Sequence, residues 1–162
     1  MYTDALEFLE EDRDGWEPFE ALLDQPDEAL ERPTPEDGPA HGWRGRDLIA
    51  HLVGWQEVAL AAAKELAVNE EAPVIARFRS IMDGGVDVHN ETIADEWRSL
   101  PLDEVRRRAR SVAGELRGHL TVVPETRWLK HPTNMRFFAE NTVDHYAEHG
   151  AELEAILAEP SS

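Results

Sequence analysis

Two histidines near the C-terminal end of the sequence, His145 and His149, are spaced four residues apart. On a helix this spacing places both imidazoles on one side, about 6 Å apart along the axis. The same side carries the apolar stripe of the segment, formed by Phe138, Thr142, Leu153 and Ile156. Both imidazoles are therefore expected to point into the protein, where their polar atoms need partners. A divalent cation shared between them would be such a partner.

His51 is the natural third ligand, because it lies at the edge of an apolar stripe that includes Leu48, Leu52 and Trp55. Three neutral imidazoles leave at least one coordination position of a metal open, which is typical of catalytic sites rather than structural ones. The alternative is that one or all of these histidines belong to the core and hydrogen-bond to carboxylates or backbone. His119 is a back-up ligand in case His51 points away.

Other residues could complete a site around these histidines. Trp55, Asn90 and Asn141 are candidates for lining a substrate pocket, although Trp55 also fits the core and Asn90 also fits a helix cap. Asn141, Glu148 and Glu152 could orient an imidazole by hydrogen bonding to it, or could equally be surface residues.

Helices must position these side chains, because apolar residues recur at helical spacing and convincing period-2 strands are missing. The pattern predicts an all-α four-helix bundle in one domain spanning residues 1–162. A long, partly helical connection separates the second and third long helices, with the breakers Pro73 and Gly84-Gly85 and one short helix over 87–100. The long helices are expected over residues 3–24, 45–68, 101–122 and 135–158.

Local signals predict how these helices begin and bend. Thr3 and Asn134 are candidate N-caps of the first and last helices. Gly15 and Pro18 predict a kink or a late start in the first helix. Pro101 sits where the third long helix can begin.

The composition narrows the class of partner. The chain has 34 acidic and 16 basic residues, a formal net charge of −18, which argues against nucleic acid or an anionic membrane surface as a partner. It contains no cysteine, so it has no thiol nucleophile of its own and no cysteine-ligated metal. The longest apolar run, residues 58–63, is far shorter than the roughly 20 residues of a membrane span. We therefore expect a cytoplasmic protein that acts on a small molecule.

Two stretches resemble motifs of the DinB-like superfamily, which includes the YfiT-type proteins and the N-terminal domain of mycothiol-dependent maleylpyruvate isomerase. Residues 43–55, WRGRDLIAHLVGW, are similar to its second-helix signature, where Asp and two apolar residues precede an Ala-His-Leu triplet. Residues 141–149, NTVDHYAEH, resemble its last-helix motif, in which two histidines four apart complete the site.

The resemblance implies an up-down-down-up bundle, with a divalent metal held by His51, His145 and His149. Nickel or zinc is favoured, and iron or manganese would also suit the site. It further implies a homodimer and a low-molecular-weight thiol cosubstrate, mycothiol or bacillithiol.

The leading hypothesis is a metal-dependent S-transferase in which such a thiol attacks a small electrophile. The alternatives are a metal-dependent hydrolase, with Glu148, Glu152 or His119 as base, and a non-catalytic stress or binding protein that merely retains the histidines.

Overall fold

The computed structural model describes residues 2–158, and residues 1 and 159–162 of the predicted domain lie outside this part. The described chain is all-α and contains no strand. Three long helices and a segmented last helix form the predicted four-helix bundle. They are α1 (Ala5–Leu22), α3 (Gly45–Val68), α6 (Leu102–Val122) and the run of α7 (Pro132–Asn141), α8 (Val143–Glu148) and α9 (Gly150–Leu157).

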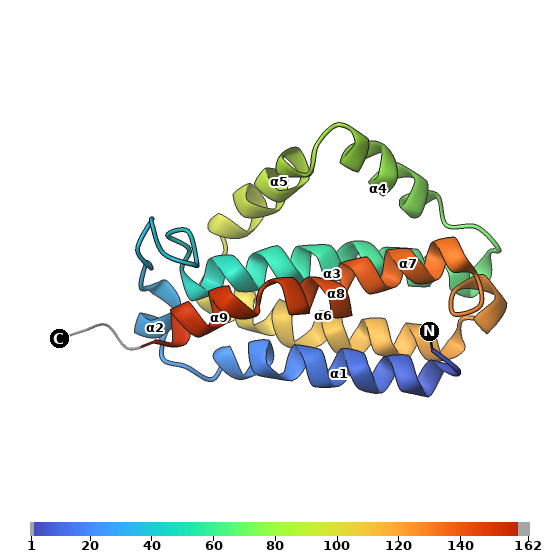
Figure 1. Ribbon diagram of the computed structural model, residues 1–162, viewed down its shortest axis with the longest axis horizontal. Coiled ribbons are helices and arrows are strands. Elements are labelled where there is room, and N and C mark those ends of the chain that lie inside the picture. The colour runs from blue at the N-terminus through green and yellow to red at the C-terminus, as the bar shows by residue number, and fades with distance from the viewer. Residues whose placement is uncertain (1, 159–162) are drawn as a thin grey trace.

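The direction of the helices explains the long connection in the middle of the chain. In Figure 1, α3 and α6 run the same way, while α1 and the run from α7 to α9 run the opposite way, which is the expected up-down-down-up order. The parallel helices α3 and α6 pack against each other. A chain that leaves one end of α3 must therefore return along the whole bundle before α6 can begin.

This return is made by α4 (Pro73–Asp83) and α5 (Val86–Arg98), which form an arch over α3 in Figure 1. Pro73, which the sequence predicts as a breaker, instead occupies the first turn of α4, so most of the stretch before residue 85 is helical. Proline is well tolerated there, since the amide hydrogen that it lacks has no partner inside the helix. The short helix α2 (Asp27–Glu31) lies in the connection between α1 and α3.

The helix starts differ from the predicted caps in two places. Asp4 caps α1, its Oδ1 accepting the amide of Glu7 at 2.9 Å, so the predicted cap at Thr3 is one residue early. The first helix does not start late, because α1 begins at Ala5 and includes both Gly15 and Pro18.

The N-cap of α7 is His131 and not the predicted Asn134. Nδ1 of His131 accepts the amide hydrogen of Asn134 at 3.2 Å. The third long helix begins as expected, directly after Pro101. Asp47 closes the first turn of α3 by accepting the amide of Arg44 at 2.8 Å, which fixes where the helix carrying His51 begins.

The last helix is broken where the sequence predicts continuity. Thr142, with φ −132° and ψ −101°, separates α7 from α8, and His149, with φ −108° and ψ 14°, separates α8 from α9. The Thr142 hydroxyl donates to the carbonyl of Phe138 at 2.6 Å, an arrangement in which the side chain competes with the helical hydrogen bonds. The two predicted ligands of this segment thus lie in and at the end of a separate short helix.

The core lies between the four long elements. Its buried residues include Leu48, Leu52, Leu116, Phe138 and Leu153. Trp55 is only partly buried, because it lines a cavity next to His51. Within residues 2–158, no helix has the length and apolar character needed to cross a membrane.

Candidate metal centre

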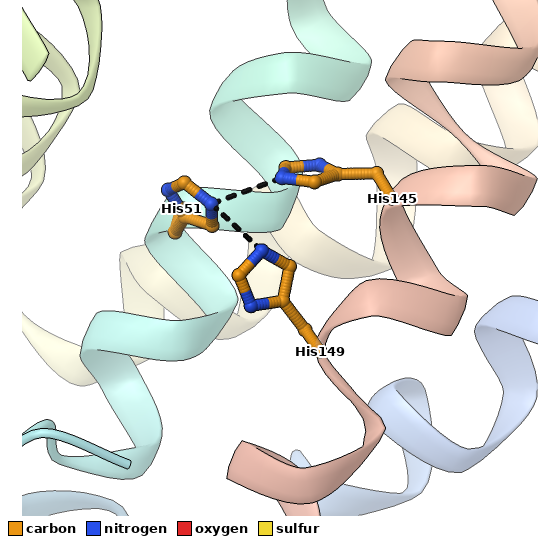
Figure 2. Close-up of side chains that lie close together, drawn as sticks. All are labelled: His51, His145 and His149. Carbon is orange, nitrogen blue, oxygen red and sulfur yellow. Dashed lines mark hydrogen bonds between the residues drawn. The ribbon is translucent and has the colours of Figure 1, made fainter. Parts of the chain in front are cut away.

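Three histidines from two sides of the bundle converge on one point, as Figure 2 shows. Nε2 of His51 on α3 lies 2.9 Å from Nε2 of His145 on α8 and 3.2 Å from Nε2 of His149, at the end of α8. One ligand atom from each of the three residues lies within 4.8 Å of the others. The structure therefore brings together all three histidines that the sequence predicts as ligands.

The donor set fits a divalent cation. Two nitrogens bound to one tetrahedral zinc at 2.0–2.1 Å are separated by about 3.4 Å, close to the spacing of these Nε2 atoms. Both Nε2 pairs share the Nε2 atom of His51. They can be hydrogen bonds only if one nitrogen of each pair carries a proton and the other accepts it, which depends on the tautomers of the rings. A cation accepts the three lone pairs at once, so His51, His145 and His149 could hold a metal ion.

The site favours the neutral form of His51 and His145, which is the form that binds metal. Burial, with a smaller contribution from the charge of His149, lowers the pKa of His51 to about 3. Burial, followed by the charge of His51, lowers the pKa of His145 to about 2. Protons therefore compete weakly with a metal for these two nitrogens near neutral pH.

Two tryptophans form aromatic walls around the histidines. The Trp43 ring lies 5.2 Å from the ring of His51 and is stacked at 6.1 Å on that of His149. The Trp55 ring lies 4.3 Å from that of His145. These apolar walls exclude water from the sides of the cluster that they cover. The other sides of the cluster face the cavities.

Two cavities meet at the cluster. The first, of about 250 Å³, is lined by His51 together with residues of α3, α5 and the chain before α3. The second, of about 290 Å³, is lined by all three histidines and by Glu148 and Glu152. Both cavities share Trp43, His51 and Asn90 in their walls, so His51 is accessible from two sides.

Helix α5 closes the outer wall of these cavities. Oδ1 of Asn90 accepts the indole hydrogen of Trp55 at 2.9 Å, which ties α5 to α3. Ile93 packs directly over Gly54, where a Cβ atom would lie only 2.6 Å from Cγ2 of Ile93. Arg46 donates from α3 to the carbonyl of Trp97 near the end of α5 and to that of Leu100, which follows α5. These contacts hold α5, one of the two helices of the arch in Figure 1, against α3.

The other predicted site residues are placed differently. Trp55 and Asn90 line the second cavity as expected. Asn141 is fully buried, donates to the carbonyl of Phe137 at 2.8 Å, and lines neither cavity. His119 is partly buried on α6 and does not belong to the three-histidine cluster.

The first cavity is also lined by Trp43, Arg46 and Trp97, which the sequence patterns do not identify as pocket residues. Trp43 precedes α3 and is outside any helical repeat, so periodicity gave no signal for its direction. Arg46 is nearly buried, and its Nη1 forms an ion pair with Glu31 at 2.7 Å. An arginine in a sequence with so many acidic residues is ordinarily assigned to the surface.

Comparison with known proteins identifies the family of the chain. A family model described as the mycothiol maleylpyruvate isomerase N-terminal domain matches residues 13–154, which include all three histidines. No curated protein and no solved structure gave a significant match. The matched segment covers most of the chain, and the chain belongs to the mycothiol maleylpyruvate isomerase N-terminal domain family, within the DinB-like superfamily.

Proposed function

We propose that this protein is a metal-dependent S-transferase that joins a low-molecular-weight thiol, such as mycothiol, to a small electrophile. The observation that carries the proposal is the convergence of three Nε2 atoms, from His51, His145 and His149, where two cavities meet. A transfer between two molecules needs room for both beside the reacting centre, and cavities of about 250 and 290 Å³ provide it. The family match supports a mycothiol-related reaction.

A divalent cation at the three imidazoles, with nickel or zinc as first candidates, would supply a Lewis acid that lowers the pKa of a thiol close to it. The chain has no cysteine, so the attacking sulfur belongs to the cosubstrate. In the transfer, a bond forms between this sulfur and the electrophilic carbon, and the leaving group departs with its electron pair. Glu148 lines the cavity that contains all three histidines and is the carboxylate that we assign to receive the thiol proton.

A second candidate function is metal-dependent hydrolysis, with water in place of the thiol. The position of Glu148 favours it, because a carboxylate beside the cluster could equally take a proton from water.

The two functions are separated by assaying protein purified without a histidine tag. Its metal content is measured first, and a panel of small electrophiles and esters is then assayed with and without mycothiol. The S-transferase proposal predicts turnover that requires thiol and is lost in His51→Ala. Turnover of esters without thiol would favour the hydrolase instead. Protein that neither binds nickel or zinc nor turns over any substrate would contradict both.

A further inference from the structure

The segment that carries two of the three histidines is a short helix with a break at each end. Helix α8 has six residues, includes His145 and ends at Glu148, directly before His149. A helix this short has little stability of its own. The non-helical residues Thr142 and His149 also interrupt the regular helix where it would continue into α7 and α9. Contacts with the rest of the bundle must therefore decide where the two imidazoles point.

Tyr146, the residue after His145, makes such contacts through its buried hydroxyl group. The hydroxyl donates to Oδ1 of Asp12 on α1 at 2.9 Å and accepts from Nε2 of Gln56 on α3 at 2.8 Å. Oδ2 of Asp12 accepts in turn from Nη1 of Arg117 on α6 at 3.0 Å. Through one hydroxyl, α8 is thus linked to all three long helices.

The bond between Tyr146 and Gln56 joins the same two helices as the metal cluster. Gln56 follows His51 by five residues on α3, and Tyr146 follows His145 on α8. Five residues correspond to about 7.5 Å along a helix. The bond therefore limits the sliding and rotation of α8 against α3 close to the histidines.

The Tyr146 ring is held as closely as its hydroxyl. A Cβ atom at Gly15 on α1 would lie 3.1 Å from Cδ2 of Tyr146, so the absence of a side chain at Gly15 gives the ring its place. On the same helix, the ring of Trp16 lies 5.5 Å from that of Tyr146. Gly15, which by sequence alone predicts an interruption of α1, instead receives this ring.

Burying such a polar network in a core costs free energy. Asp12 is 1% exposed, and moving its carboxylate out of water costs free energy that apolar side chains of similar volume would not. Buried polar networks of this kind fix one arrangement of the elements that they join, because any other arrangement leaves their groups unpaired. Here the arrangement that is fixed is that of α8.

We infer that Tyr146 is a positioning residue for the metal centre. Its hydroxyl holds α8 so that His145 and His149 already meet His51 before a cation binds. The inference rests on the proposed function only in that a cation occupies the three-histidine cluster. Removing the hydroxyl leaves all three ligands in the chain but frees the helix that aims two of them, so metal affinity falls with no ligand removed.

The test uses Tyr146→Phe, which keeps the ring, and Gln56→Met, which keeps a side chain of similar length. The control is Leu120→Ala, which removes a buried side chain of α6 outside this network. Cobalt(II), a spectroscopic substitute for zinc, is titrated into each metal-stripped protein, and its absorption bands report the coordination geometry. Amide hydrogen exchange of α8 is measured separately on the metal-free proteins.

Both network variants are expected to bind cobalt roughly tenfold or more weakly, with altered absorption bands. In both, α8 amides should exchange faster, by roughly tenfold, than in the parent. Leu120→Ala should keep the parent's affinity and bands. If Tyr146→Phe fails to fold, Gln56→Met decides the question by the same criteria.

Unchanged cobalt affinity in the network variants would overturn the inference, whether or not exchange is faster, and so would unchanged exchange in α8. A parent protein that binds neither cobalt, nickel nor zinc would instead contradict the proposed function. The exchange rates of the metal-free proteins would still show whether Tyr146 holds α8.

Discussion

Oε1 of Glu152 lies 3.4 Å from Nδ1 of His149, on the side of the imidazole away from the cluster. Both side chains are largely shielded from solvent, with exposed fractions of 12% and 15%. A carboxylate in this position favours the tautomer with the proton on Nδ1, which leaves the Nε2 lone pair free for a metal. The contact falls short of hydrogen-bond geometry, and we propose that Glu152 favours in this way the form of His149 that a cation requires.

Replacing Glu152 by Gln should therefore weaken metal binding without removing a ligand. Losing a carboxylate that orients a metal-binding histidine typically lowers affinity by roughly 10- to 100-fold. Competition titration of zinc against a chromophoric chelator measures the effect. Glu154→Gln, a change on the exposed side of the same helix, is the control and should bind as the parent does. Equal affinities in parent and Glu152→Gln would show that this carboxylate has no role at the centre.

The contact between Gly54 and Ile93 predicts how α5 is held over the pocket. Gly54→Ala places a methyl group where Ile93 atoms lie, so the folded state should lose about 1–3 kcal/mol of stability through overpacking. Ile93→Ala should relieve the clash, so the double variant should be more stable than the sum of the two single changes. Urea unfolding of the four proteins gives this cycle. Strictly additive losses would mean that α5 does not rest on Gly54.

The lowered pKa values of His51 and His145 predict acid sensitivity of the metal-free protein. Below about pH 6.5 the unfolded chain takes up protons at both histidines. The folded chain takes them up only near pH 3 and pH 2. Stability should therefore fall as the pH decreases from 6.5 toward 3, by roughly 1.4 kcal/mol per pH unit for each group.

Urea unfolding of metal-free protein between pH 7 and pH 4.5 measures this slope. The matched variant is His145→Gln, in which one of the two titrating groups is gone, so its stability should fall less steeply with decreasing pH. Carboxylates that titrate in the same range are common to both proteins and cancel in the comparison. Identical slopes would indicate that His145 is not buried in its neutral form.

The sequence predicts well that the three candidate ligands face the interior, because each lies on an apolar stripe whose direction follows from helical periodicity. His51 is anchored by the regular pattern of α3, and His145 and His149 by their own spacing. Periodicity does not reveal the breaks at Thr142 and His149, which depend on a buried hydroxyl and on contacts with other helices.

The pocket is less predictable for a different reason. Trp43 lies outside any helix, and Asn90 and Ile93 reach the site only because the arch of α4 and α5 folds back over α3. Such contacts join residues far apart in the chain, and no local pattern encodes them. Asn141 is an example of the opposite kind. It lies one helical turn before His145, which favours a position near the site, but its side-chain amide donates to the carbonyl of Phe137 in α7.

The most direct test of the account is calorimetric titration of nickel and zinc into the metal-stripped parent and single alanine variants of the histidines. If His51, His145 and His149 share one cation, each of these three variants should lose most of the parent's affinity, because two imidazoles hold a divalent ion far less well than three. His119→Ala and His41→Ala should bind like the parent, since neither belongs to the cluster. Parent-like affinity in His51→Ala would contradict the three-histidine centre and remove the main support for the proposed enzyme.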